Sequence, residues 1–329
     1  MATRAAAGSE AHVAQAARDA VEHGNAVDAV VTAVLVAAAE SPSVLLGPVQ
    51  LLVGGAGAGL MAIDGRVRQP GLGVPRPRGV VAGATVPLPA RVGVPGLPAA
   101  LAIALASLGS ISMSKAAGPA VERARARSAE RGATLRSLAR RGAAAMTDDA
   151  IADELTAVAG RAAGGTITRE DLNALRPGVI TCEDPGDEGI VYVPWASAGA
   201  DASTTHVVAA ADARGRVAVA CYEAPLDGLP VPHLGLVLPA FASPVMRGET
   251  RVRPGEPCPC SAPIALRARK GLVDLAMGVA ETSDAEAALA TILARLDPTT
   301  PVAEAVRSVS GRAVAVVRTR ETALAIASA

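Results

Sequence analysis

The stretch Thr204-Thr205-His206-Val207-Val208-Ala209-Ala210-Ala211 begins with two hydroxyl side chains and continues as an apolar run. The turn-like segment Asp212-Ala213-Arg214-Gly215 follows it, and then a second apolar run from Arg216 to Tyr222, so the pattern predicts a β-hairpin. Threonine is common at the start of a strand because its β-branched side chain favours extended backbone. Thr204 and Thr205 by themselves therefore indicate a strand and no particular chemistry.

Two phrases upstream of this hairpin give it a context. The first is Gly24-Asn25-Ala26-Val27-Asp28-Ala29, and the second is Gly164-Gly165-Thr166-Ile167-Thr168-Arg169-Glu170-Asp171-Leu172. Each contains a capping residue followed three positions later by an aspartate, a spacing typical of a helix start. Taken in order along the chain, the two phrases and the threonine pair resemble the γ-glutamyltranspeptidase family.

That resemblance carries expectations about fold and processing. The family is similar to other N-terminal nucleophile hydrolases, and it implies an α+β fold, a four-layer αββα sandwich in which two sheets pack face to face between helical layers. It further implies that the precursor cuts itself before a threonine, which becomes the first residue of the smaller subunit and the catalytic nucleophile. Thr204 is then the expected nucleophile, and the cleavage site lies between Ser203 and Thr204.

A threonine at a new N-terminus has its own base. The hydroxyl is a weak nucleophile until its proton is removed, and the α-amino group freed by cleavage can remove it. That amine titrates at about 7.7 to 8.0, so part of it is neutral at physiological pH. The implied reaction is acyl transfer from a small-molecule amide or related acyl substrate to water or an amine, and it requires no cofactor.

The sequence departs from the family pattern at the substrate-binding positions. The stretch Gln69-Pro70-Gly71-Leu72 lacks the arginine that holds a substrate carboxylate, and Arg66 and Arg68 lie nearby but out of register. Glu223 and Pro225 stand where the family has a threonine and an asparagine, and the acidic pair that holds a substrate amine is absent from residues 236–244.

Further departures concern the oxyanion side of the expected site. Pro259-Cys260 replaces a pair of serines, and a region near Glu281-Thr282 replaces the Gly-Gly that supplies oxyanion donors. The residues that could shape an altered pocket are Thr205, Glu223, Cys260, Glu281 and Thr282.

Loss of both substrate clamps argues against a free γ-glutamyl substrate, because a bidentate arginine is hard to replace for that task. Two interpretations remain open. One is an N-terminal threonine hydrolase or acyltransferase with altered specificity, and the other is a catalytically inactive, unprocessed homologue with a structural or binding role.

Other reactive side chains have simpler interpretations. Cys258 and Cys260 are too closely spaced, and have too few histidines near them, to predict a zinc site, so no metal is expected. A Cys260 nucleophile with His233 as its base is a weaker alternative. His206 should point to the opposite face of its strand from Thr205 and is expected to be a packed, satisfied polar residue.

Composition limits the class of protein. The chain has 329 residues, half of them apolar and with no formal net charge, so we expect one domain over 1–329 and neither a nucleic-acid nor a membrane partner. No secretory signal is visible and four cysteines make no disulfide framework, which favours a cytoplasmic location. If cleaved, the large subunit 1–203 and the small subunit 204–329 should stay associated with each other.

The remaining pattern alternates helical and strand signals. Ser9 should cap a first helix, Gly24 should end it and Asn25 should cap a second, and the glycine string at 54–59 suits a hairpin better than a phosphate loop because no lysine-bearing helix follows it. Further helices are expected over 99–108, 115–131 and 147–159, and after residues 283 and 300, with hairpins over 263–276 and 313–326.

Overall fold

Two antiparallel sheets form the centre of the protein, as seen in a computed structural model that describes residues 3–186, 188–195, 203–296, 301–307, 311–319 and 321–328. The first sheet has the strand order β1-β6-β7-β2-β3-β4, and the second has the order β13-β12-β11-β10-β5. The strands of the first sheet are β1 Ala5–Gly8, β2 Val49–Gly55, β3 Gly59–Gly65, β4 Gly178–Thr181, β6 Thr205–Ala211 and β7 Arg216–Glu223. Those of the second are β5 Glu188–Tyr192, β10 Ile264–Arg269, β11 Leu272–Ala280, β12 Arg312–Arg318 and β13 Ala323–Ala327.

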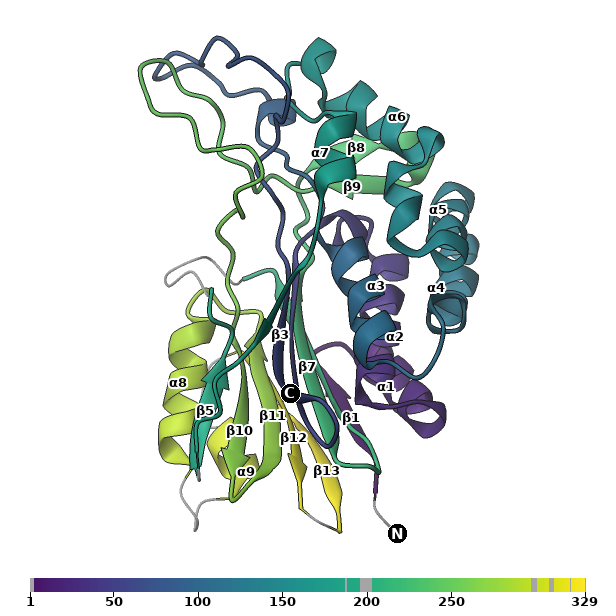
Figure 1. Cartoon of the computed structure of the whole chain (residues 1–329), viewed down its shortest axis with the longest axis vertical. Helices are drawn as coiled ribbons and strands as arrows, with labels where there is room; N and C mark the ends of the chain where they lie inside the picture. The colour runs from purple at the N-terminus through teal and green to yellow at the C-terminus, as the bar shows by residue number, and fades with distance from the viewer. Residues whose placement is uncertain are drawn as a thin grey trace.

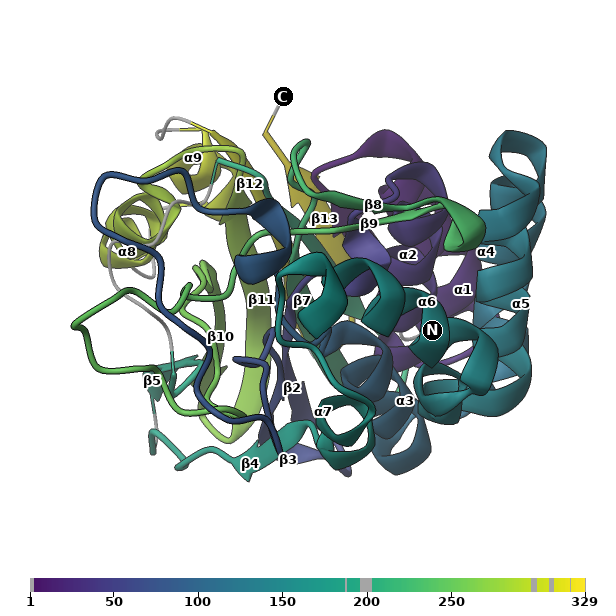
Figure 2. The same cartoon turned by 90° about the horizontal axis from the view of Figure 1, so that it is seen from above.

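Helices cover the outer face of each sheet (Figure 1, Figure 2). Helices α1 Ala11–His23, α2 Ala26–Glu40 and α3 Leu97–Leu108 lie against the first sheet, and α4 Met113–Arg127 and α5 Ala129–Arg141 lie outside them. Helices α8 Ala285–Arg295 and α9 Val302–Val306 cover the second sheet. The order of layers is therefore helix, sheet, sheet, helix, which confirms the predicted αββα sandwich.

Alternation along single strands explains the layers. In β7, the side chains of Val217, Val219 and Cys221 belong to the apolar cluster between the two sheets, whereas those of Ala218, Ala220 and Tyr222 belong to the cluster under the helices. Successive side chains in a strand point to opposite faces, so a strand that is buried on both sides reads as one continuous apolar run. A third cluster joins the second sheet to α8 and α9.

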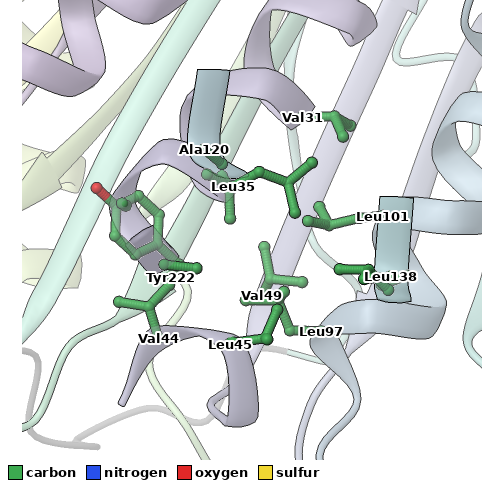
Figure 3. Packing of buried hydrophobic residues seen from close by; sticks show 14 of the residues in the cluster. Val31, Leu35, Val44, Leu45, Val49, Leu97, Leu101, Ala120, Leu138 and Tyr222 are labelled. Carbon is green, nitrogen blue, oxygen red and sulfur yellow. The ribbon is translucent and has the colours of Figure 1, made fainter. Parts of the chain in front are cut away.

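The largest apolar cluster lies between the first sheet and its helices (Figure 3). Tyr222 contributes from β7, Leu35 from α2 and Leu101 from α3, and each is nearly completely buried. With so few aromatic residues, alanine, valine and leucine fill this space, and the small alanines let α2 and α4 approach each other closely. No helix among the described residues has the length and apolar character to cross a membrane.

A smaller upper lobe rises from one end of the sheets (Figure 1). It contains helices α6 Asp149–Ala159 and α7 Arg169–Ala174, strands β8 Leu229–Val231 and β9 Leu236–Leu238, and the irregular connections after β3 and β9. Short 3₁₀ turns punctuate the chain at η1 Val44–Leu46, η2 Leu88–Ala90, η3 Gly142–Thr147, η4 Arg161–Ala163 and η5 Pro232–Leu234. The connection after β3 is rich in proline and glycine, which is typical of irregular backbone.

Both capping phrases form the predicted helix starts. Asn25 caps α2, where its side chain accepts hydrogen bonds from the backbone N–H groups of Val27 and Asp28, and Asp28 accepts in return from the backbone of Asn25. Thr168 and Asp171 form the same reciprocal pair at α7. The hairpins β2–β3, β6–β7, β10–β11 and β12–β13 also form as predicted.

Some predicted helix starts and extents were wrong. Ser9 does not cap α1, because its hydroxyl accepts a hydrogen bond from the backbone of Val207 in β6 instead. The helix predicted over 115–131 is two helices, since Ser128 ends α4 and caps α5. The three-residue spacing of Ser283 and Glu286 predicts Ser283 as the cap of the helix expected after residue 283, whereas α8 begins one residue later, after Asp284.

Candidate active site

Thr204 lies at one end of the first sheet, just before β6. The register places Thr205 opposite Glu223, and Val49 opposite both Tyr222 and Gly65, so these residues share the end from which the upper lobe rises. Thr204 is half-buried while Ser203 is exposed. The backbone N–H of Ala224 donates to the Thr204 carbonyl over 2.9 Å, which extends the ladder by one bond and fixes the Thr204 backbone.

Glu223 contacts both threonine hydroxyls. It is the last residue of β7 and is only 3% exposed. Its Oε2 accepts a hydrogen bond from Thr204 Oγ1 over 2.8 Å, and its Oε1 accepts one from Thr205 Oγ1 over 2.7 Å. Three of the residues singled out in the sequence thus meet, and a proton acceptor lies within direct reach of the Thr204 hydroxyl.

His206 lies on the other face of β6, as predicted. Its ring stacks on Tyr222 with centroids 5.5 Å apart, and its Nδ1 lies 3.5 Å from Glu281 Oε1 and 3.7 Å from Glu10 Oε2. Tyr222 donates its hydroxyl to the same Glu10 oxygen over 2.7 Å. The interpretation of His206 as a packed residue with polar partners is consistent with these contacts.

Glu281 and Thr282 follow the end of β11, beside Thr205. The backbone N–H of Glu281 donates to the Thr205 carbonyl over 3.0 Å, so this N–H group already has a hydrogen-bond acceptor within the protein. Its carboxylate lies 3.3 Å from Arg312 Nη1, on the His206 side of the strand. Thr282 packs beside Gly311. The carboxylate of Glu281 therefore contacts His206 and Arg312, and not the Thr204 hydroxyl.

Cys260 belongs to a buried polar contact that the sequence analysis missed. Gln50, which is 1% exposed in β2, donates from Nε2 to Cys260 Sγ over 3.1 Å and to the Ser261 carbonyl over 2.9 Å. Gln50 Oε1 accepts from Trp195 Nε1 over 2.6 Å. The sequence signal for this contact was a single glutamine inside the apolar run of β2.

Burial decides the chemistry of the thiols. Desolvation raises the pKa of Cys260 far above its ordinary value, and the nearby charge of Glu223 raises it further. Such a thiol stays protonated, which does not suit a nucleophile. His233, its suggested base, lies in η5 beside α5, whereas Cys260 contacts β2, so the structure does not form that pair.

The structure gives no sign of a metal centre in the part of the chain that it describes. Within those ranges, no group of three or more histidine, cysteine, aspartate or glutamate side chains could hold a metal ion. All four cysteines are free thiols, with Cys221, Cys258 and Cys260 buried.

Arg66 and Arg68 lie near this site but already have partners. Arg66 binds both carboxylate oxygens of Asp64, at 3.0 Å each, and Arg68 Nη2 binds Asp64 Oδ2 at 2.9 Å. The Arg66 guanidinium also lies over the Trp195 ring, 5.6 Å from its centroid. A substrate carboxylate would have to displace Asp64 to use either arginine.

Two cavities in the described part of the protein lie at opposite ends of the first sheet. The cavity bounded by Pro48, Gln50 and Glu223 has no room for a water molecule. A cleft of about 600 Å³ lies at the opposite end, lined by the turns at Gly55, Gly215 and Gly271. The glycine string at 54–59 thus forms a hairpin turn beside this cleft.

Comparisons with known proteins support the architecture. No family model matches the sequence, and no curated protein matches it. Two structures of LmbA2991 are 14% identical to this chain, cover 99% of it and 96% of their own length, and give TM-scores of 0.78 and 0.76. Cephalosporin acylase from Bacillus halodurans is 15% identical, covers 96% of this chain and 92% of its own, and gives a TM-score of 0.75.

A γ-glutamyltranspeptidase from Pseudomonas nitroreducens matches 54% of this chain and 66% of its own, with 20% identity and a TM-score of 0.45. LmbA2991 and the acylase resemble this protein over nearly the whole chain. Because the sequence identities are so low, this resemblance shows the fold and not the function. The chain shares its αββα fold with LmbA2991 and with the acylase, and this is the fold that the sequence phrases predicted.

Proposed function

We propose that this protein is an N-terminal threonine hydrolase or acyltransferase that matures by cleavage between Ser203 and Thr204. The observation that carries the proposal is the position of Thr204 just before β6, an inner strand of the first sheet, with its hydroxyl 2.8 Å from the buried carboxylate of Glu223. After cleavage, the free amine of Thr204 would serve as the base for the same hydroxyl.

The proposed substrate is a small amide or related acyl compound other than a free γ-glutamyl compound. Arg66 and Arg68 are bound to Asp64, so neither is free to hold a substrate carboxylate. Glu223 adds a negative charge beside the nucleophile, which disfavours an anionic group at that point of the substrate. The acceptor of the acyl group would be water or an amine.

Intact mass and denaturing gels of freshly purified protein test this proposal. Cleavage at residue 203 would give segments of roughly 20 and 12 kDa from the 32.6 kDa chain, and sequencing of the smaller segment would begin at Thr204. Thr204→Ala should remain intact, and Thr204→Ser, which keeps a hydroxyl, should still be cut. The cleaved protein would then be screened against amides and anilides for release of the amine.

A single full-length chain in the wild type would contradict the proposal. It would leave the Thr204 amine in a peptide bond, where it cannot act as a base, and would favour the non-catalytic, unprocessed alternative.

A further inference from the structure

Self-cleavage needs a base that the mature enzyme does not need. In the intact chain the nitrogen of Thr204 is part of the Ser203–Thr204 peptide bond, so its lone pair is delocalised and it cannot accept the hydroxyl proton. The base that acts after cleavage is absent before it. Another group must therefore activate the Thr204 hydroxyl for the first step.

The structure shows a carboxylate at the required place. Glu223 Oε2 lies 2.8 Å from Thr204 Oγ1, within the range for direct proton transfer. We propose that Glu223 is the base that activates Thr204 for cleavage of the Ser203–Thr204 bond. This inference rests on the proposed function, because it assumes that Thr204 attacks that bond.

The step balances without any oxidant or metal. Glu223 takes the proton from Thr204 Oγ1, and the oxygen forms a bond to the carbonyl carbon of Ser203. The bond between that carbon and the Thr204 nitrogen breaks, and the nitrogen receives the proton from Glu223. Water then hydrolyses the resulting ester, which leaves a carboxylate on Ser203 and a free amine and hydroxyl on Thr204.

The surroundings of Glu223 hold it in position for this transfer. Thr205 Oγ1 donates to the second carboxylate oxygen over 2.7 Å, which fixes the rotation of the group. The Ala224 amide fixes the Thr204 backbone over 2.9 Å. The adjoining cavity has no room for water, so competing hydration of the carboxylate is limited on that side.

Both contacts depend on Glu223 being the strand residue opposite Thr205. The threonine that the family resemblance places at this position has no carboxylate and could not act as a strong proton acceptor. The replacement therefore has a chemical meaning beyond a changed pocket: it adds a base at the cleavage site.

A time course of cleavage after short expression tests the proposal. Intact mass would follow the wild type, Glu223→Gln, Glu223→Ala and the matched control Glu10→Gln, whose carboxylate contacts Tyr222 on the opposite face of the sheet. Glu223→Gln should slow cleavage by about 10² to 10⁴-fold, the usual contribution of a positioned base. Glu10→Gln should cleave at the wild-type rate.

Two further measurements separate a base from a group that merely orients the threonine. The wild-type rate should rise with pH as a carboxyl group loses its proton and then level off, and Glu223→Gln should lack this rise. Added formate or acetate should partly restore cleavage in Glu223→Ala, because it supplies a base to the vacated space. Circular dichroism of each variant would report whether it folds. If a variant is less stable, rescue by the added carboxylate distinguishes loss of the base from loss of stability.

The outcomes distinguish the two proposals. If the wild type stays intact at every pH, the proposed function fails and the role of Glu223 falls with it. If the wild type is cut, Thr204→Ala is intact and Glu223→Gln is cut at the wild-type rate, only the role of Glu223 is overturned. Slow cleavage in Glu223→Gln without rescue of Glu223→Ala would likewise overturn the base in favour of an orienting role.

Discussion

At the residue scale, the threonine pair and Glu223 form one buried hydrogen-bonded group. When one member of such a group is removed, most of the lost stability comes from the remaining partner. A buried carboxylate that loses its hydrogen-bond donor does not regain a bond from water. Thr205 is 1% exposed and Glu223 is 3% exposed, so water cannot easily replace a lost hydroxyl. This group should therefore contribute to stability whether or not the chain is cleaved.

The stability of this group can be measured with Thr205→Val, which keeps the shape of the side chain and removes its hydroxyl. We expect the free energy of unfolding to fall by about 1 to 3 kcal/mol, measured by urea denaturation. Thr291→Val is the matched control, because among the described residues the exposed Thr291 hydroxyl donates to one acceptor, the Ala287 carbonyl in α8. Equal losses in the two variants would contradict the argument.

Cys258 gives a prediction about pH. Burial raises its pKa to about 12, whereas a thiol in the unfolded chain titrates near 8.5. Between these values the unfolded chain has lost a proton that the folded protein keeps, so stability is fully present below about pH 8.5 and falls as pH rises. The slope for one thiol is about 1.4 kcal/mol per pH unit.

Chemical denaturation at several pH values from 8 to 10.5 would measure this slope. Cys258→Ala removes the titrating group, so its free energy of unfolding should fall less steeply than that of the wild type, by up to about 1.4 kcal/mol per pH unit. The difference in slope is the test, because the lost packing lowers the stability of the variant equally at every pH. Parallel curves would count against a buried thiol.

Sequence reasoning reached part of the site at this scale. Thr204, Thr205 and Glu223 were singled out by their order along the chain, and the register of β6 against β7 brings them together. Gln50 and Trp195 were missed because their partners lie 210 and 145 residues away along the chain. No local pattern encodes a contact between a strand and connecting segments that lie so far away along the chain.

At the scale of elements, local rules predicted helix starts well where the cap is also a tertiary contact. Asp28 is fully buried, accepts from the Asn25 backbone over 2.7 Å and also accepts from the Ser110 backbone over 2.9 Å. The same carboxylate thus starts α2 and ties down the connection from α3 to α4. Because Asp28 makes both contacts, the phrase Gly24 to Ala29 indicates the fold as well as the start of one helix.

Asp28→Ala should accordingly cost more than the loss of an ordinary cap. Ser112 is the comparison, because its hydroxyl caps α4 with one exposed hydrogen bond to the Lys115 backbone. We expect Ser112→Ala to cost about 1 kcal/mol and Asp28→Ala at least about 2 kcal/mol more, since buried donors lose their acceptor. Thermal and urea unfolding would measure both, and similar losses would contradict the double role.

Strand β1 shows where local rules stop. Its sequence, Ala5-Ala6-Ala7-Gly8, has low β-propensity, yet all four residues are buried and pair with β6. The pairing comes from the neighbouring strand, so no reading of residues 5–8 alone could have predicted it. The Ser9 hydroxyl is similarly drawn away from the helix cap by an amide of β6.

At the scale of the whole molecule, the first segment (1–203) and the second segment (204–329) both contribute strands to each of the two large sheets. Strands β6 and β7 come from the second segment, and they lie between β1 and β2, which come from the first. In the second sheet, β5 from the first segment pairs with β10 from the second. Neither of the two large sheets is complete within one segment.

This interleaving predicts that a cleaved protein stays in one piece. Separation would break backbone ladders at β1–β6, β2–β7 and β5–β10 and would expose the apolar cluster between the sheets, so its cost approaches that of unfolding. Size-exclusion chromatography under native conditions should give the cleaved wild type and the uncut Thr204→Ala variant the same elution volume, whereas a denaturing gel should resolve two bands only for the wild type. For the same reason, the 204–329 segment expressed alone should be insoluble or unfolded, because β6 and β7 would present unpaired edges and an uncovered apolar face. Native elution of the smaller segment by itself would mean that the shared sheets do not hold the two segments together.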